Sequence, residues 1–131
     1  MSNDERTVEE LLELNRLLLQ SIETADWETY VRLCDPGLTA REPEAAGHLV
    51  QGMSFHHHYF DSHSKRKSCN TTIASPHVRL LGDVAIVTYV RLTQTLDEND
   101  AHATNATEET RVWEKQDGTW KHVHFHRSVI G

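Results

Sequence analysis

The chain opens with hydrophobic residues at helical spacing. The sequence Thr-Val-Glu-Glu at 7–10 matches a capping box and predicts that a helix begins there. Apolar residues then recur every three or four positions and form one broad stripe, made of Leu11, Leu14, Leu18 and Ile22 and widened by Leu12, Leu17 and Leu19. A stripe of this width is typical of a helix that packs against a sheet.

Short elements are predicted after this helix. Asp26 is suited to cap a second helix that includes Cys34, and the Asp-Pro-Gly sequence at 35–37 ends it. Ser54 is suited to cap a third helix. The predicted elements of this region are two strands, the third helix and a basic loop, at 38–41, 48–50, 55–62 and 65–67.

Strand patterns dominate the second half of the chain. Four strands are predicted, at 70–81, 84–96, 107–115 and 119–127. Pro76 indicates a bulge or an edge position in the first of them, and Asp117-Gly118 indicates a hairpin turn between the last two. Helices followed by an antiparallel meander predict an α+β fold, in which a curved sheet wraps the long helix and forms a cone.

Composition and charge narrow the class of protein. With 131 residues, the chain is expected to form a single domain over 1–131. The formal net charge of −7 argues against partners such as nucleic acid or an anionic membrane. No signal peptide, membrane span or disulfide framework is apparent, so we expect a cytoplasmic protein in which Cys34 and Cys69 are reduced.

Side chains alternate between the two faces of a strand, so the sequence shows which residues share a face. On each of the last three predicted strands, one arginine shares its face with apolar or aromatic residues. These arginines are Arg91, Arg111 and Arg127. If these faces are concave, the guanidinium groups converge in one cavity. Glu109 is the obvious internal partner, and one carboxylate against three arginines leaves unbalanced positive charge. A guanidinium suits a carboxylate because it donates two parallel hydrogen bonds. Solvated rim residues or internal ion pairs are the alternative interpretation.

The ten histidines fall partly into two groups. His56 opens a run of three in the third helix, whereas His122, His124 and His126 alternate along the last strand, on the face opposite Arg127. The outer two of these strand histidines are roughly 13 Å apart, too far to share one metal ion, so no metal site is predicted.

Catalytic motifs are weak. A pocket histidine such as His56, with a carboxylate and Tyr30 or Tyr59, could serve as an acid–base pair. However, the chain has no nucleophile elbow, phosphate-binding loop or dinucleotide fingerprint. We therefore predict no cofactor and do not expect an enzyme.

Collinear runs over about residues 7–128 carry a family resemblance. They include Cys-Asp-Pro-Gly-Leu-Thr-Ala at 34–40, Glu-Glu-Thr-Arg-Val-Trp at 108–113 and Val-His-Phe-His-Arg-Ser at 123–128. These runs resemble the association (hub) domain of calcium/calmodulin-dependent protein kinase II. The resemblance implies a nuclear transport factor 2-like cone, and self-association into dimers that build stacked rings. It also implies that the domain carries no kinase chemistry.

The resemblance implies a ligand site as well. The family's hub has a polar pocket in which a helix histidine and three strand arginines bind small carboxylates. The matching residues are His56, Arg91, Arg111 and Arg127, and we add Glu109 and Tyr30 as candidate neighbours.

Three functions therefore stay open. The first is a homo-oligomeric hub with a pocket for a small carboxylate. The second is a small-molecule-binding protein or an isomerase- or dehydratase-like enzyme of the same superfamily. The third is a regulatory partner that co-assembles with a hub-containing kinase. Because the chain has no kinase domain or calmodulin-binding helix, we expect a free-standing relative.

Overall fold

The computed structural model of the chain describes residues 1–61 and 68–130. Its helices are α1 (Asn3–Glu23), α2 (Trp27–Leu33), α3 (Ser54–Asp61) and the short 3₁₀ helix η1 (Pro43–Ala45). Its strands are β1 (Cys34–Arg41), β2 (Val50–Gln51), β3 (Ser68–Leu81), β4 (Val84–Leu96), β5 (His102–Gln116) and β6 (Thr119–Val129). The end of the predicted third helix at Ser62 and the predicted basic loop at 65–67 lie outside the described residues.

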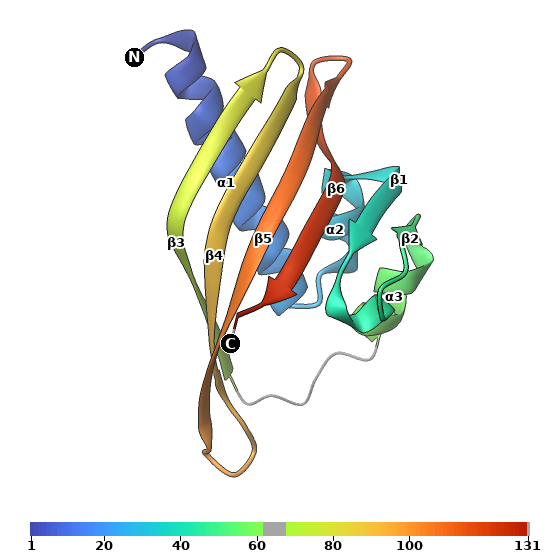
Figure 1. Cartoon of the computed structure of the whole chain (residues 1–131), viewed down its shortest axis with the longest axis vertical. Coiled ribbons are helices and arrows are strands. Elements are labelled where there is room, and N and C mark those ends of the chain that lie inside the picture. Colours follow the sequence, from blue (N-terminus) through green and yellow to red (C-terminus); the bar gives the residue numbers. More distant parts are fainter. Residues whose placement is uncertain (62–67, 131) are drawn as a thin grey trace.

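The strands form one curved sheet in the order β2-β1-β6-β5-β4-β3. All neighbouring pairs are antiparallel except β1 and β6, which run parallel. In Figure 1 the long helix α1 runs behind the sheet, and α2 and α3 lie near the β1–β2 end. The predicted α+β fold, with a long N-terminal helix against a curved sheet, is confirmed.

The core fills the space between α1 and the inner face of the sheet. Leu11 and Leu18 on the helix belong to the same buried cluster as Val87 and Trp113 on the strands. The indole Nε1 of Trp113 donates a hydrogen bond to Oδ1 of Asn15 at 3.2 Å, so the one buried amide of this helix face is satisfied.

The predicted start of the first helix is wrong. Ser2 is the N-cap: its hydroxyl accepts a hydrogen bond from the Glu5 amide, and the Glu5 carboxylate accepts one from the Ser2 amide. Thr7 lies inside the helix, where its hydroxyl donates to the Asn3 carbonyl at 3.0 Å. A capping box therefore exists, but it lies at 2–5 instead of 7–10.

Cys34 is a buried core residue as predicted, but it is not helical. Asp26 caps α2 as predicted, accepting from the Thr29 amide at 3.2 Å, and the helix ends at Leu33. Cys34 has extended backbone angles and begins β1. The Asp-Pro-Gly sequence at 35–37 therefore lies within β1, where the pairing with β6 is irregular.

Several strand boundaries differ from the predicted ones, and Pro76 fits both of its predicted interpretations, a bulge and an edge position. The β5 strand starts at His102, so the β4–β5 hairpin is longer than expected and projects at the bottom of Figure 1. Similarly, β3 begins at Ser68. Pro76 lies in a register shift between Ala74 and His77, and β3 is also an edge strand.

Candidate functional site

A cavity of about 320 Å³ lies between the helices and the inner face of β4, β5 and β6. Five of the six predicted site residues line it: Tyr30, His56, Arg91, Arg111 and Arg127. The sixth, Glu109, is buried and pairs with two of these arginines. The expectation that the three strand arginines gather on one inner face is therefore confirmed; their role in binding stays a prediction.

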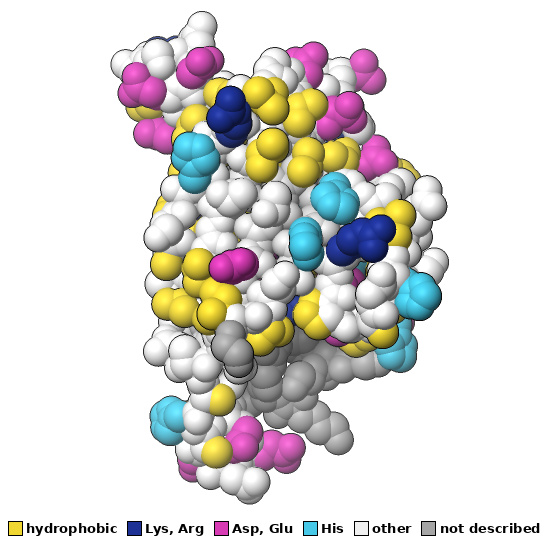
Figure 2. All heavy atoms as spheres, viewed as in Figure 1, with side chains coloured by type: hydrophobic (Ala, Val, Ile, Leu, Met, Phe, Trp, Pro, Cys, Tyr) yellow, Lys and Arg dark blue, Asp and Glu magenta, His cyan; other side chains and the backbone are white. Residues whose placement is uncertain are grey.

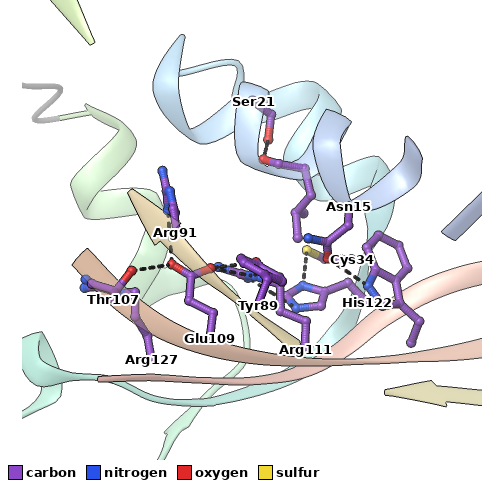
Figure 3. A network of polar contacts seen from close by, with 12 residues as sticks. Asn15, Ser21, Cys34, Tyr89, Arg91, Thr107, Glu109, Arg111, His122 and Arg127 are labelled. Carbon is purple, nitrogen blue, oxygen red and sulfur yellow. Dashed lines mark hydrogen bonds and ion pairs between the residues drawn. The ribbon is translucent and has the colours of Figure 1, made fainter. Parts of the chain in front are cut away.

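Glu109 is the centre of a buried polar network (Figure 3). Its Oε1 accepts hydrogen bonds from the Tyr89 hydroxyl at 2.6 Å and from Arg111 Nη2 at 3.0 Å. Its Oε2 accepts from the Thr107 hydroxyl at 3.1 Å and from Arg91 Nη1 at 3.4 Å. Burial alone would raise the pKa of Glu109, but the charges of Arg111 and Arg91 outweigh it and lower that pKa to about 2.

Arg111 is a structural cation with little reach into the cavity. Its guanidinium lies 4.5 Å from the centre of the Phe125 ring, and its Nε donates to the Tyr89 hydroxyl at 2.8 Å. Burial acts to lower its pKa, but Tyr89 and Glu109 raise it overall, so the group stays charged. Because its side chain is nearly fully buried, Arg111 mainly fixes Glu109 and the cavity floor.

The prediction that His122 lies on the outer face of the last strand is wrong. The β5–β6 register shifts, because the adjacent residues Val112 and Trp113 pair with His124 and His122 respectively. Val123 is left without a partner in this register, which is a β-bulge. The bulge reverses the alternation of side chains and turns His122 inward, where it is fully buried.

The inward His122 lies between a cation and a thiol. Its Nε2 is 3.4 Å from Arg111 Nη1, and its Nδ1 is 3.5 Å from Cys34 Sγ. Burial, and then the charge of Arg111, lower the pKa of His122 well below its usual value. One feature of the sequence could have revealed the bulge. Trp120 and Phe125 are five residues apart, so a regular strand would place them on opposite faces. Both can be buried on the inner face only if a bulge lies between them.

Sequence reasoning missed two carboxylates at the cavity. Glu42 Oε1 lies 2.6 Å from His56 Nε2, and both side chains are nearly buried. Both carboxylate oxygens of Glu44 accept hydrogen bonds from Nη2 of Arg127. The prediction of a single carboxylate against three arginines is therefore wrong, and internal ion pairing, the alternative interpretation, applies to each arginine. The Glu-Pro-Glu sequence is visible at 42–44, but no local pattern places this turn over the cavity.

Two buried nitrogens at the cavity nevertheless lack a hydrogen-bond partner among the described residues: Arg91 Nε and His56 Nδ1. The contact of Arg91 with Glu109 is also long, at 3.4 Å, and its side chain is 12% exposed. Buried donors and acceptors are nearly always satisfied in folded proteins. Arg91 is therefore the cavity cation with most hydrogen-bonding capacity left for an anion.

The described part of the chain shows no arrangement of three or more His, Cys, Asp or Glu side chains that could hold a metal ion. Within that part, no helix is long and apolar enough to cross a bilayer.

Comparison with known proteins first defines the class of fold. A nuclear transport factor 2-like protein from Cytophaga hutchinsonii superposes with a TM-score of 0.78 at 20% identity, covering 99% of this chain and 100% of that one. At this identity the likeness shows the fold alone. The chain has the nuclear transport factor 2-like fold that the family resemblance implies.

The particular family is shown by closer matches. Residues 7–131 match the calcium/calmodulin-dependent protein kinase II association domain. The chain is similar to the hub homology domain of Chlamydomonas reinhardtii, with a TM-score of 0.88 and 48% identity over 95% of this chain and 99% of that one. It is 47% identical over 123 residues to the kinase's delta subunit from Oryctolagus cuniculus, covering 92% of this chain and 23% of the subunit.

The chain therefore belongs to the association-domain family of calcium/calmodulin-dependent protein kinase II, and the predicted resemblance is confirmed. It spans about a quarter of the length of the curated relatives it matches.

Proposed function

We propose that the chain is a self-associating hub domain whose cavity binds a small carboxylate. Self-association is supported by family membership and by the outer face of the sheet. Ile86, Val90 and Leu92 alternate with inward residues of β4 and are only half-buried. Figure 2 shows hydrophobic side chains and histidines on this face, with acidic side chains mostly toward its two ends. Such a surface can be buried against a second copy without strong like-charge repulsion.

Light scattering after size-exclusion chromatography tests self-association. At micromolar concentration we expect a mass several times the 15.0 kDa of one chain. Val90→Glu places a charge on the outer face and should lower that mass while circular dichroism stays unchanged. A wild-type monomer would rule out the hub.

The carboxylate site is supported most by Arg91. Its Nε has no partner among the described residues, and its ion pair with Glu109 is long, at 3.4 Å. The cavity volume is at the lower end of the roughly 300–1,000 Å³ that is usual for ligand pockets. An anion at Arg91 would accept the missing hydrogen bond from Nε, and a carboxylate matches the fork of a guanidinium through two parallel hydrogen bonds.

Calorimetric titration with butyrate tests this site. Arg91→Gln should weaken binding about tenfold or more, because it removes a charge-assisted hydrogen bond in a partly buried site. Arg79→Gln is the matched control, since Arg79 is an exposed arginine on the neighbouring strand β3. Equal affinity of wild type and Arg91→Gln for butyrate would contradict the site.

A second candidate, an isomerase- or dehydratase-like enzyme, is favoured by the Glu42–His56 pair at the cavity. A carboxylate that orients a histidine is a common arrangement for general acid–base catalysis. The discriminating measurement is exchange of the C3 protons of 2-oxobutyrate with deuterated water. Acceleration that His56→Asn abolishes would favour the enzyme, whereas the hub predicts none.

Co-assembly with a hub-containing kinase is supported by family membership alone. It predicts mixed oligomers when the two proteins are purified together, whereas strictly separate oligomers would argue against it.

A further inference from the structure

Glu44 differs from the other two carboxylates at the cavity in its exposure to solvent. Its side chain is 37% exposed, compared with 7% for Glu42 and 0% for Glu109. We propose that Glu44 is a tethered competitor, which occupies Arg127 in the absence of a ligand and is displaced when a small monocarboxylate binds. This inference rests on the proposed carboxylate site.

The contact between Glu44 and Arg127 resembles the contact that a ligand carboxylate would make with Arg127. Both carboxylate oxygens of Glu44 accept hydrogen bonds from Nη2 of Arg127, and both residues line the cavity. A guanidinium recognises a free carboxylate through the same donors. A ligand carboxylate that is to use Arg127 must therefore take the place of Glu44.

Of the three carboxylates, only Glu44 can withdraw at low cost. Glu109 balances the buried Arg111, and its removal would leave an unpaired charge in the core. Glu42 is nearly buried against His56. In contrast, Glu44 can be hydrated as it leaves, and ion pairs between partly exposed groups are weak.

The backbone around Glu44 can stay in place during this exchange. Glu44 is the middle residue of η1, a single turn that begins with Pro43 and is closed by a hydrogen bond from the Ala46 amide to the Pro43 carbonyl at 3.1 Å. Proline fixes its own φ angle, which stiffens the turn. Displacement therefore requires a change of side-chain rotamer and no change of fold.

The charges at the cavity define the class of ligand. Three arginines and three glutamates gather there, so their formal charges cancel while Glu44 is in place. When Glu44 turns away, the group has one excess positive charge. A ligand with one carboxylate restores the balance, whereas a second carboxylate would face Glu42 or Glu109.

Calorimetric titration of the full chain with butyrate tests the exchange. Glu44→Gln removes the competing charge and should bind butyrate about threefold to tenfold more tightly than wild type. Glu44→Asp keeps the charge but is one methylene shorter, so it should also bind more tightly if contact with Arg127 is what competes. Glu13→Gln is the matched control, because Glu13 also pairs with an arginine, Arg16 at 2.6 Å, on the exposed surface of α1. It should bind butyrate like wild type.

The outcomes separate this inference from the proposed function on which it rests. If wild type and Glu44→Gln bind butyrate equally, the competitor is ruled out but the carboxylate site stands. If Glu44→Asp binds like wild type while Glu44→Gln binds more tightly, the effect is one of charge alone and displacement is wrong. If neither wild type nor Glu44→Gln binds butyrate, both proposals fail. Butyrate binding seen only in Glu44→Gln is the expected result in its strongest form.

Discussion

At the scale of the residue, His122 makes the stability of the folded chain depend on pH. It is fully buried beside Arg111, and burial and this charge hold its pKa well below the usual value of about 6.5. In the unfolded chain the same histidine takes up a proton near that usual value. As the pH falls below about 6.5, the unfolded state therefore binds more protons than the folded state, and the free energy of unfolding decreases.

We predict that His122→Gln makes this dependence on pH less steep. Glutamine does not titrate and can still accept a hydrogen bond from Arg111. Between pH 7 and pH 5, wild type should lose up to about 1.4 kcal/mol of stability per pH unit more than the variant. Urea unfolding followed by tryptophan fluorescence measures this difference. His102→Gln, at an exposed position, should keep the wild-type slope, and parallel curves for wild type and His122→Gln would contradict the prediction.

The residues of the site differ in how far the sequence could predict them. Alternation along β4 and β5 is enough to place Arg91, Arg111 and Glu109 together, because neither strand slips relative to the other. The same rule fails for His122, because the bulge at Val123 exchanges the inner and outer faces for the residues of β6 that precede it. Glu44 lies beyond any local rule, because it reaches the cavity only through the folding of a turn over a distant strand.

At the scale of the element, α1 shows why a correct motif can give a wrong boundary. Two capping boxes lie in register with the helix, Ser2 with Glu5 and Thr7 with Glu10. No proline or glycine lies between them, so nothing stops the helix from extending to the earlier one. The apolar stripe could not decide between them, because it begins only at Leu11. The pattern of apolar residues therefore predicts that the helix exists, and only the capping contacts show where it begins.

We predict that Ser2→Ala weakens the start of α1, whereas Thr7→Ala does not. Ser2 satisfies the Glu5 amide, and the loss of such a cap costs about 1 kcal/mol of local helix stability. The Thr7 hydroxyl only donates to a carbonyl that already lies within the helix. Amide hydrogen exchange at Glu5 should become severalfold faster in Ser2→Ala. Equal exchange in the two variants would show that the cap at Ser2 does not hold the helix end.

At the scale of the whole molecule, the fold and the family are encoded more redundantly than the site. The stripe of α1, the four long strands and the hairpin turn each favour the same α+β cone, so an error of a few residues at any one boundary leaves the architecture unchanged. The charge of the cavity has no such redundancy. It depends on which charged side chains the strands β4, β5 and β6 and the turn at 42–44 bring together, and this turn alone changes the count by two carboxylates.

This charge count predicts which anions the cavity selects. Glu42 and Glu109 are buried and stay in place when a ligand binds, so a second carboxylate on the ligand would be repelled. Succinate, a dianion at pH 7.5, should therefore bind at least about tenfold more weakly than butyrate, which is a difference of about 1.4 kcal/mol. Monomethyl succinate is the matched control, because it has nearly the size of succinate but one charge, and it should bind like butyrate. Calorimetry at equal ionic strength measures all three ligands, since salt screens the repulsion. Equal or tighter binding of succinate would mean that the excess positive charge of the cavity is larger than one.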